Sequence, residues 1–571
     1  MENRFPIFDI TPIVQYGDQI IPVKSISNEA INIRATVIRE GHEGLVVEVV
    51  LVDPSGVEVN RVQMREYWPG TDRYEAEVRP TGVGIWHFYI AASSPDGELT
   101  SESALNPICA EPDRALVGAW YEFFPRSEGA KLSADGAIKS GTFKTAEKSL
   151  QRVADMNFDV LYLPPIHPIG HSFRKGRNNT LTPTSTDPGV PWAIGNSDGG
   201  HDSINPELGT MKDFEHFMKA AAKLKIEVAM DFALQCSPDH PWALAHREWF
   251  TIRADGTIAY AENPPKKYQD IYPINFEKDY EGMLGESYRI LSLWISKGVK
   301  IFRVDNPHTK PVQFWHELIN RVNRESPEVV FLSEAFTRPA MMHALGKAGF
   351  QQGYTYFTWR TTKHELTTYA SELATETSAF FRPNFWVNTP DILPFHLQSG
   401  APSIFAMRAL LAATLSPSWG MYAGYELYEY LPIREGAEEY LDSEKYEIKV
   451  RNWNKPSLAP FVGLLNSIRR QNPALQRLRN LRFHPTDSEK IIAYSKREGE
   501  NLILVLVNLD PIHAQETIVH WNFFDLGIAE GAFNVEDLIT GHSFEYTPHA
   551  WIRIDPAAPG TPVGHILKVT L

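Results

Sequence analysis

The sequence has few cysteines and no long apolar run, and both absences narrow the class of protein. Only Cys109 and Cys236 occur among its 571 residues, which excludes a disulfide framework or a zinc site built from cysteines. No stretch reaches the apolar length that spans a bilayer. The first residues, MENRFPIFDI, lack the basic and apolar segments of a signal peptide. We therefore expect a cytoplasmic protein that has no membrane partner.

Basic residues are also fewer than acidic residues. The chain holds 55 Lys and Arg against 70 Asp and Glu, a formal net charge of −15. This balance argues against nucleic acid as a partner, because phosphate backbones bind basic surfaces. Aromatic residues make up 12% of the chain. Sugar rings stack on aromatic side chains, so this fraction fits a carbohydrate enzyme, although a large aromatic core would explain it equally well.

Hydrophobic patterning divides the chain into three predicted domains. Residues 1–115 hold short alternating segments between turn signals, typical of an immunoglobulin-like β-sandwich. Residues 116–478 alternate strand-like and helical segments, which predicts a catalytic (β/α)8 TIM barrel of the α/β class. Two long polar loop excursions interrupt it, at 166–209 and 233–285. Residues 479–571 return to β segments and predict a C-terminal β-sandwich.

The strand candidates are short and apolar. In the N-terminal domain they lie at 31–38, 45–52, 74–78 and 85–90. In the barrel the eight candidates lie at 119–124, 159–163, 226–231, 300–305, 329–334, 354–359, 385–388 and 419–423, with helices predicted at 145–157 and 211–225. In the C-terminal domain they include 491–494 and 502–507.

Three carboxylates close strand-like segments of the predicted barrel. Asp305 ends KIFRVD, Glu334 ends VVFLSE, and Asp391 closes VNTPD. Catalytic residues of such barrels lie at the C-terminal ends of strands. Asp305 and Glu334 are 29 residues apart, about one βα unit, so they should lie on neighbouring strands. Strands about 4.8 Å apart suit the carboxylate pair of a retaining glycosidase, whose members are roughly 5–5.5 Å apart.

A strand-end carboxylate can also be a cap or a salt-bridge partner, and for a single residue that explanation is the better one. Three together favour catalysis, because Arg303 lies two residues before Asp305 on the same face of its strand. A nearby positive charge keeps a carboxyl group ionised. The sequence therefore predicts a nucleophile at Asp305 and an acid/base at Glu334.

These motifs resemble those of the α-amylase superfamily, glycoside hydrolase family 13. FRVDN (302–306), SEAF (333–336) and NTPD (388–391) are similar to its nucleophile, acid/base and third-carboxylate motifs. Two departures matter. The superfamily usually has Asn-His after the third-strand Asp, where this chain runs from Asp231 to Gln235-Cys236. It also has His before the third carboxylate, where Pro390 stands here. Both departures argue against plain starch hydrolysis.

One branch of the superfamily accounts for the departures. Long segments across 116–475 resemble the α-1,4-glucan:maltose-1-phosphate maltosyltransferases. They are KGRNN (175–179), DFALQCSPDHPW (231–242), ENPPKKYQDIYPINF (262–276), RVDNPHTKP (303–311), SEAFTRP (333–339), YTYFTWR (354–360) and KYEIK (445–449). The resemblance implies that a maltosyl unit passes from α-maltose 1-phosphate to the non-reducing end of an α-1,4-glucan, releasing phosphate.

The resemblance also implies residue roles. Asp305 would be the nucleophile, Glu334 the general acid/base and Asp391 the transition-state stabiliser. The phosphate-contacting pattern is matched by Asn263, Lys266, Tyr268 and Asn306. Positions that hold the maltosyl unit are matched by Lys175, Asn179, Gln235, Asp270, Lys445 and Tyr446. No metal-ligand spacing stands out, and the family needs no cofactor.

A further departure concerns assembly. Members of the family commonly carry a helical bundle inserted in the N-terminal region, where it adds to a dimer contact. About 25 residues separate Ile90 from the barrel at Leu116, too few for such a bundle. We expect a homodimer with a smaller contact than fuller relatives have.

Two other functions stay open from the sequence alone. The first is a phosphate-independent glucan maltosyltransferase or an α-amylase-type hydrolase, which would not need Asn263, Lys266 and Tyr268. The second is a silent barrel that only binds glucan, against which the three carboxylates and Arg303 argue.

Overall fold

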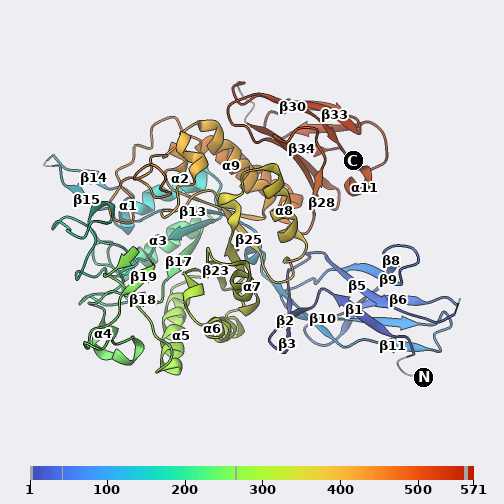
Figure 1. The fold of residues 1–571 in the computed structure, drawn as a ribbon, viewed down its shortest axis with the longest axis horizontal. Coiled ribbons are helices and arrows are strands. Elements are labelled where there is room, and N and C mark those ends of the chain that lie inside the picture. The colour runs from blue at the N-terminus through green and yellow to red at the C-terminus, as the bar shows by residue number, and fades with distance from the viewer. Residues whose placement is uncertain (1–3, 42, 135, 264–265, 559–562, 571) are drawn as a thin grey trace.

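A computed structural model gives the fold of the chain (Figure 1). It describes residues 4–41, 43–134, 136–263, 266–558 and 563–570, and of Asn263 and Lys266 the backbone only. Figure 1 shows the barrel beside two β domains formed by the two ends of the chain. This arrangement confirms the predicted fold class.

The N-terminal part forms two packed sheets. One has the strand order β1-β5-β9-β8, and the other has the order β4-β12-β10-β6-β7 with β11 beside β10. Alternate residues of β5 are buried, as the sequence pattern predicts. The strands are β1 (Ile7–Thr11), β2 (Val14–Tyr16), β3 (Gln19–Ile21), β4 (Val23–Ile26), β5 (Ile31–Val37), β6 (Val46–Val52), β7 (Glu58–Gln63), β8 (Arg65–Glu66), β9 (Arg73–Val78), β10 (Gly84–Ser93), β11 (Thr100–Glu102) and β12 (Asn106–Glu111).

The path from this part to the barrel is short. After β10 the chain forms β11, β12 and the 3-10 turn Asp113–Ala115, then enters the first barrel strand at Gly118. No α-helix lies within residues 94–117, all of which the structure describes. The stretch that the sequence singles out as too short for a bundle therefore holds none.

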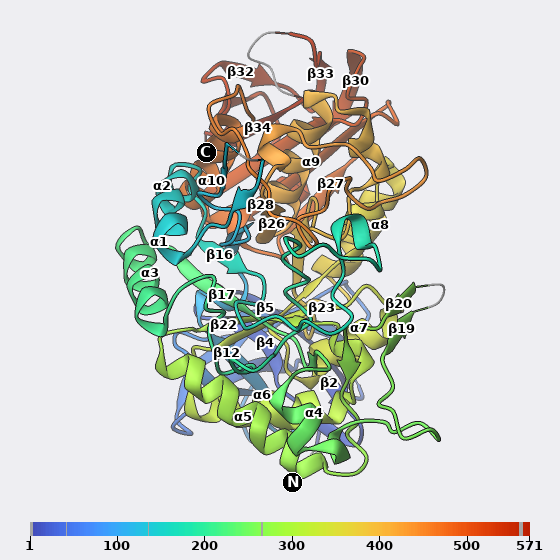
Figure 2. The same ribbon diagram turned by 90° about the vertical axis from the view of Figure 1, so that its left-hand side faces the viewer.

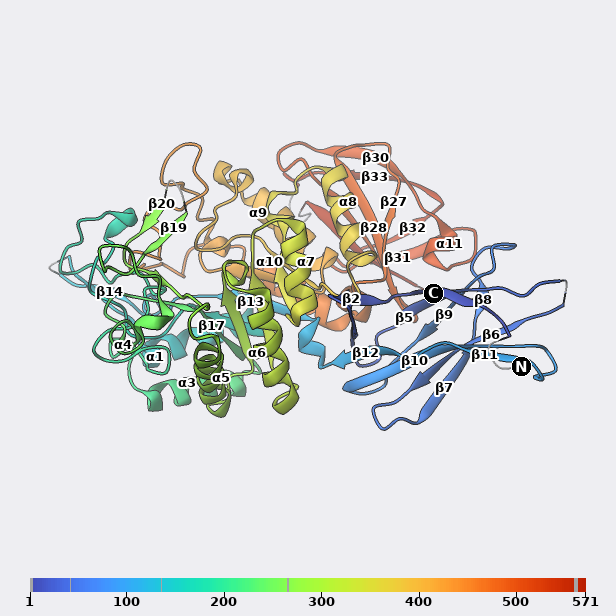
Figure 3. The same ribbon diagram turned by 60° about the horizontal axis from the view of Figure 1, so that its bottom comes forward.

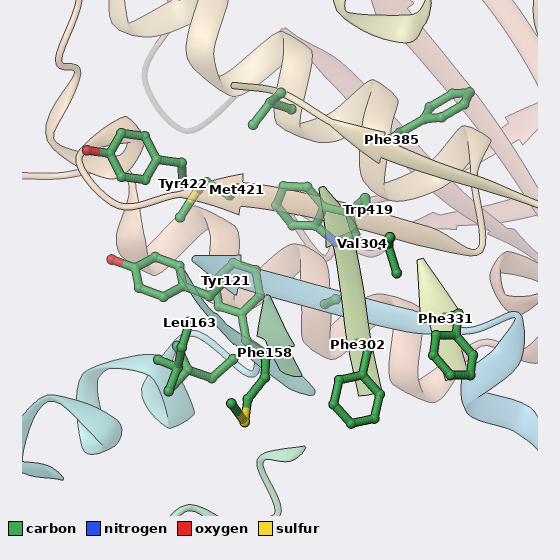
Figure 4. Packing of buried hydrophobic residues seen from close by; sticks show 14 of the residues in the cluster. Tyr121, Phe158, Leu163, Phe302, Val304, Phe331, Phe385, Trp419, Met421 and Tyr422 are labelled. Atoms are coloured by element: carbon green, nitrogen blue, oxygen red, sulfur yellow. The ribbon is translucent and has the colours of Figure 1, made fainter. Parts of the chain in front are cut away.

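Eight parallel strands close the barrel. Their order around it follows the chain. They are β13 (Gly118–Glu122), β16 (Val160–Leu163), β17 (Glu227–Phe232), β22 (Ile301–Asp305), β23 (Val330–Glu334), β24 (Gln352–Tyr354), β25 (Pro383–Trp386) and β26 (Ser418–Tyr422). Figure 4 shows Phe302 and Val304 of β22 in the apolar layer outside these strands. Because strand side chains alternate, Arg303 and Asp305 point the other way.

Helices surround the barrel, and Figure 2 shows α3 and α5 on its outside. They are α1 (Phe143–Ala146), α2 (Leu150–Asp155), α3 (Met211–Lys223), α4 (Pro241–Ala245), α5 (Tyr280–Ser296), α6 (Val312–Glu325), α7 (Pro339–Ala348), α8 (Lys363–Ala374), α9 (Pro402–Leu415) and α10 (Ala459–Gln471). In the described part of the chain, no helix has the length and apolar character needed to cross a membrane.

Two sequence predictions about the barrel are wrong. The sixth strand, predicted at 354–359, ends at Tyr354, and Tyr356–Trp359 form a 3-10 turn. Asp391 does not close a strand, since β25 ends at Trp386. The carboxylate lies instead in the loop that follows.

The C-terminal part is a second pair of sheets. One has the order β27-β28-β29-β34-β31-β32, and the other pairs β30 with β33. The strands are β27 (Leu481–His484), β28 (Ile491–Glu498), β29 (Asn501–Asn508), β30 (Gln515–His520), β31 (Phe533–Asp537), β32 (Ser543–Tyr546), β33 (His549–Ile554) and β34 (Gly564–Val569), with the short helix α11 (Phe523–Leu526) between them. The boundaries at 115/116 and 478/479 stay predictions.

Candidate active site

A cavity of about 540 Å³ opens at the C-terminal ends of the barrel strands. Both loop excursions contribute to its walls, so residues far apart in the sequence meet there. Eleven of the predicted site residues line it: Lys175, Asn179, Gln235, Tyr268, Asp270, Asp305, Asn306, Glu334, Asp391, Lys445 and Tyr446. Arg303 is not in the lining but contacts Asp305.

Arg303 joins two buried carboxylates. Its Nη1 donates to Asp305 Oδ1 at 2.9 Å and to Asp231 Oδ2 at 2.8 Å. Asp231 Oδ2 also accepts from the Tyr162 hydroxyl at 2.5 Å and from Trp192 Nε1 at 3.2 Å. These donors fix Asp231, which in turn fixes the guanidinium against Asp305. Asp231 therefore positions Arg303, a function that the sequence reasoning missed.

Glu334 lies directly beside Asp305. The two residues are register partners on the parallel strands β22 and β23. Asn306 has left-handed backbone angles, φ 42° and ψ 53°, and this turn directs its N–H to Glu334 Oε2 at 3.1 Å. Strands lie about 4.8 Å apart, which matches the close carboxylate pair of retaining glycosidases.

Their surroundings separate the pKa values of the two carboxyl groups. Burial alone would raise the pKa of Asp305, but the positive charges of Arg303 and Lys310 outweigh burial and hold it below its ordinary value. Burial raises the pKa of Glu334 to about 7, and repulsion from Asp305 and Asp391 adds to this. Asp305 is thus suited to act as an anionic nucleophile, and Glu334 can both give and take a proton near neutral pH.

The third carboxylate is held by a lysine. Lys445 Nζ donates to Asp391 Oδ1. Burial alone would lower the pKa of Lys445, but the charge of Asp391 raises it overall, so the pair is ionic. The Lys445 ammonium also lies 5.4 Å from the ring centre of Trp192. This ion pair fixes the Asp391 loop against the rim of the cavity.

Polar residues from the two loop excursions also line the cavity. Lys175 is buried and donates to Gln269 Oε1 at 2.7 Å. Burial raises the pKa of Asp270, while the charge of Lys175 opposes the change. Gln235 lies on a short strand, Gln235–Cys236, which pairs with Tyr272–Pro273. These contacts hold hydrogen-bond donors and acceptors in place around the cavity.

Two predicted phosphate contacts, Asn263 and Lys266, have side chains outside the described residues. Their backbones pair across the hairpin formed by β19 (Ala261–Asn263) and β20 (Lys266–Tyr268). Tyr268 of the same hairpin lines the cavity. The hairpin thus lies beside the cavity, and the assignment of phosphate contacts to it stays a prediction.

Sequence reasoning did not assign several of the lining residues to the site, and three of them bear on its chemistry. Lys310 is buried, and its Nζ donates to the backbone oxygens of Asp305 at 3.3 Å and Asn306 at 3.2 Å. Trp192 and His308 also line the cavity. Lys310 and His308 lie within the quoted motif RVDNPHTKP, which was the available signal.

Several buried polar atoms of the site have no partner among the described residues. They are Asp305 Oδ2, Asp270 Oδ1, Asn179 Oδ1 and His308 Nδ1. Buried polar groups in proteins are nearly always hydrogen-bonded. Around this one cavity, such atoms leave hydrogen-bonding groups free for a polar ligand. Among the described residues, no group of three His, Cys, Asp or Glu side chains could hold a metal ion.

Comparison with known proteins shows the family of this chain. The family description "Alpha-1,4-glucan:maltose-1-phosphate maltosyltransferase, domain N/S" matches residues 3–98, and "GLGE, C-terminal" matches residues 483–569. Alpha-1,4-glucan:maltose-1-phosphate maltosyltransferase 1 from Streptomyces coelicolor is 47% identical, with 99% of this chain and 96% of the relative covered. The chain belongs to the α-1,4-glucan:maltose-1-phosphate maltosyltransferase family. It is thus a member of a glycosyltransferase family, as predicted.

Other relatives bear the same name. The protein from Corynebacterium pseudotuberculosis is 42% identical over 100% of this chain and 97% of its own. The one from Mycobacterium tuberculosis is 51% identical over 84% of this chain and 69% of its own. The alignment with the Streptomyces coelicolor relative has 652 positions, 81 more than the 571 residues here, so that relative has residues with no counterpart in this chain.

Solved structures support the fold. An α-amylase from Geobacillus thermoleovorans complexed with acarbose has a TM-score of 0.61 at 13% identity, covering 80% of this chain and 98% of its own. A cyclomaltodextrinase has a TM-score of 0.61 at 15% identity, covering 95% of this chain and 97% of its own. Both agree with an α-amylase-like barrel with added β domains.

Proposed function

We propose that this chain transfers a maltosyl unit from α-maltose 1-phosphate to the non-reducing end of an α-1,4-glucan and releases phosphate. The main support is membership of the maltosyltransferase family over 99% of the chain. The pairing of Asp305 with Glu334 at the mouth of the barrel supports a retaining mechanism.

In the first step the Asp305 carboxylate attacks the anomeric carbon of the donor. A bond forms between Asp305 and the sugar, and the bond between the anomeric carbon and the phosphate oxygen breaks. Phosphate leaves with the bonding electron pair. Arg303 keeps Asp305 ionised, and Asp391, fixed by Lys445, faces the positive charge that develops on the sugar ring.

In the second step Glu334 takes the proton from the 4-hydroxyl of the acceptor glucan. That oxygen attacks the anomeric carbon, the ester to Asp305 breaks, and an α-1,4 bond forms. The two inversions together retain the α configuration. Because burial raises the pKa of Glu334 to about 7, its carboxylate is basic enough to act near neutral pH.

Cations and neutral donors serve the leaving phosphate. Charge-assisted hydrogen bonds to phosphate oxygens are among the stronger ones in proteins. We assign this function to Asn263, Lys266, Tyr268 and Asn306 on the basis of the family motifs. Lys310 Nζ holds Asn306 in place by donating to its backbone oxygen.

The experiment is incubation with α-maltose 1-phosphate and maltohexaose, with products followed by mass and free phosphate by a colour assay. The proposal expects chains that grow by two glucose units, with one phosphate released for each addition. Asp305→Ala is the control and should show neither change. Growth without phosphate release, or release of free maltose alone, would favour the phosphate-independent transferase or the hydrolase.

A further inference from the structure

A second cavity, of about 350 Å³, lies between the N-terminal sheets and the barrel. In Figures 1 and 3 the N-terminal strands run beside α7 at this junction. One wall is the outer face of strands β4, β12 and β10, and the other is formed by α6 and the end of α7. Neither the carboxylates nor the loop excursions of the active site reach it.

Strand register places one lysine in this wall. Lys24 of β4 pairs with Cys109 of β12, and Cys109 pairs with Ile85 of β10. The neighbouring residues Val23 and Ile108 belong to the core between the sheets, so Lys24, Cys109 and Ile85 point the other way, toward the barrel.

Lys24 is buried without a partner. Its exposed fraction is 8%, and within the described part of the chain its Nζ forms no hydrogen bond or ion pair. The nearby carboxylate of Glu111 accepts from Arg382 instead. Burial lowers the pKa of Lys24, and the charge of Glu111 only partly opposes this. Lys24 Nζ is not among the fully buried side-chain atoms that lack a partner, so the ammonium keeps some accessible surface at the cavity and is free to pair with an anion there.

Most of the remaining lining surface is apolar, and the polar residues Glu111, His316, Asn320, Asn323, Arg324, Lys347 and Gln351 also contribute to it. Ile85 and Val83 keep 43% and 50% of their surface exposed, although both line the cavity. Ile319 and Phe380 face them from the barrel. Lys347 lies over the Phe380 ring at 4.9 Å. A mainly apolar cavity with one buried ammonium suits a ligand that has an apolar body and one anionic group.

We propose that this cavity binds a small organic anion, an apolar body that carries one carboxylate, with the Lys24 ammonium as the partner of the carboxylate. The ligand body packs on Ile85, Val83 and Phe380. The volume is near the lower limit of small-molecule sites, roughly 300–1,000 Å³, so the ligand is short. The site is separate from the proposed maltosyl transfer and does not depend on it.

The test is calorimetric titration of the full chain with octanoate, and with octylammonium as the probe of opposite charge. We expect octanoate to bind with a stoichiometry of one and octylammonium not to bind. Lys24→Met should weaken octanoate binding at least tenfold. Lys490→Met, an exposed lysine of the C-terminal part, should bind as the wild type does.

A second pair of variants guards against misfolding. Ile85→Glu places a carboxylate at the exposed edge of the cavity and should also weaken octanoate binding at least tenfold. Ile518→Glu, at a residue of similar exposure in the C-terminal sheets, should not. Lys24→Met without ligand should be at least as heat-stable as the wild type, because it removes an unpaired buried charge. Absence of octanoate binding, equal binding by Lys24→Met, binding of octylammonium, or a less stable Lys24→Met protein would each overturn the proposal.

Discussion

Replacing Glu334 by Gln should slow transfer to the acceptor far more than release of phosphate. Gln keeps the shape of the side chain but cannot take a proton. Phosphate is a good leaving group that needs little protonation, whereas the acceptor hydroxyl needs a base. General acid–base catalysis contributes roughly 10²–10⁴-fold, so the acceptor step should slow by about that factor. Phosphate release should slow by less than the lower end of that range.

The pKa of Glu334 gives the same prediction a pH signature. Burial raises that pKa to about 7, and the ionised form is the base. The acceptor step should therefore be fastest above about pH 7 and lose roughly tenfold per unit well below it. The pKa of Asp305 lies below its ordinary value, so the nucleophile stays ionised across this range. Glu334→Gln should show no inflexion near pH 7 in the acceptor step.

Single-turnover mixing separates the two steps. Enzyme and α-maltose 1-phosphate are mixed first and phosphate is followed by rapid quench, and maltohexaose is then added to the loaded enzyme. The matched control is Glu328→Gln, an exposed residue at the opposite end of β23, which should change neither rate. An equal loss in both steps, or an inflexion near pH 7 that persists in Glu334→Gln, would refute the reasoning.

Three further predictions concern the donor, the fold and assembly. Lys266→Ala should raise KM for α-maltose 1-phosphate by a factor that corresponds to about 1.5–3 kcal/mol. The control is Lys267→Ala, which should leave KM unchanged. An unchanged affinity of Lys266→Ala for phosphate would contradict this prediction. Lys496 is fully buried without a partner, and burial lowers its pKa to about 7. The unfolded chain thus binds more protons between pH 7 and about 10.4, so stability rises with pH there. Lys496→Met should raise the free energy of unfolding at pH 7 by on the order of 4 kcal/mol, which urea denaturation would show as a higher midpoint; a lower midpoint would contradict this. Because the chain lacks the inserted bundle, its dimer contact should be small, and contacts below about 1,200 Å² tend to be weak. Sedimentation at decreasing protein concentration should therefore show that the dimer dissociates, while the activity per chain persists. A dimer that stays intact at nanomolar concentration would contradict this.

The sequence predicted the barrel well where strands are long and apolar. The strands that end at Asp305 and Glu334 lie within one residue of their predicted bounds. Their side-by-side placement follows from the βα unit that joins them, because the crossover through α6 returns the chain to a parallel strand next to the first. The ion pair between Arg303 and Asp305 follows from alternation alone.

The prediction failed where distant residues decide the local structure. The segment at 354–359 has the aromatic and β-branched composition of a strand. The chain instead turns after Tyr354, because Thr355 accepts from the Phe357 N–H and Arg408 of α9 donates to the Phe357 oxygen at 2.5 Å. Its guanidinium also lies 3.9 Å from the Phe357 ring centre. The local composition does not reveal a hydrogen-bond partner that lies 51 residues away in the sequence.

The same limit applies to the site. Trp192 and Asp231 meet because a loop excursion folds over the third strand, and no spacing in the sequence indicates this contact. Asp391 was identified by its motif, but its pairing with Lys445 depends on two loops that approach only in the folded chain.

The most direct test of the mechanism is to trap the covalent intermediate. A 2-fluoro maltosyl donor slows the second step, and Glu334→Ala slows it further, so that the sugar ester accumulates and can be located by peptide mass mapping. We predict that the added mass lies on Asp305 and is absent from Asp305→Ala. Labelling of Glu334, Asp391 or another carboxylate in its place would contradict the assignment of Asp305 as the nucleophile.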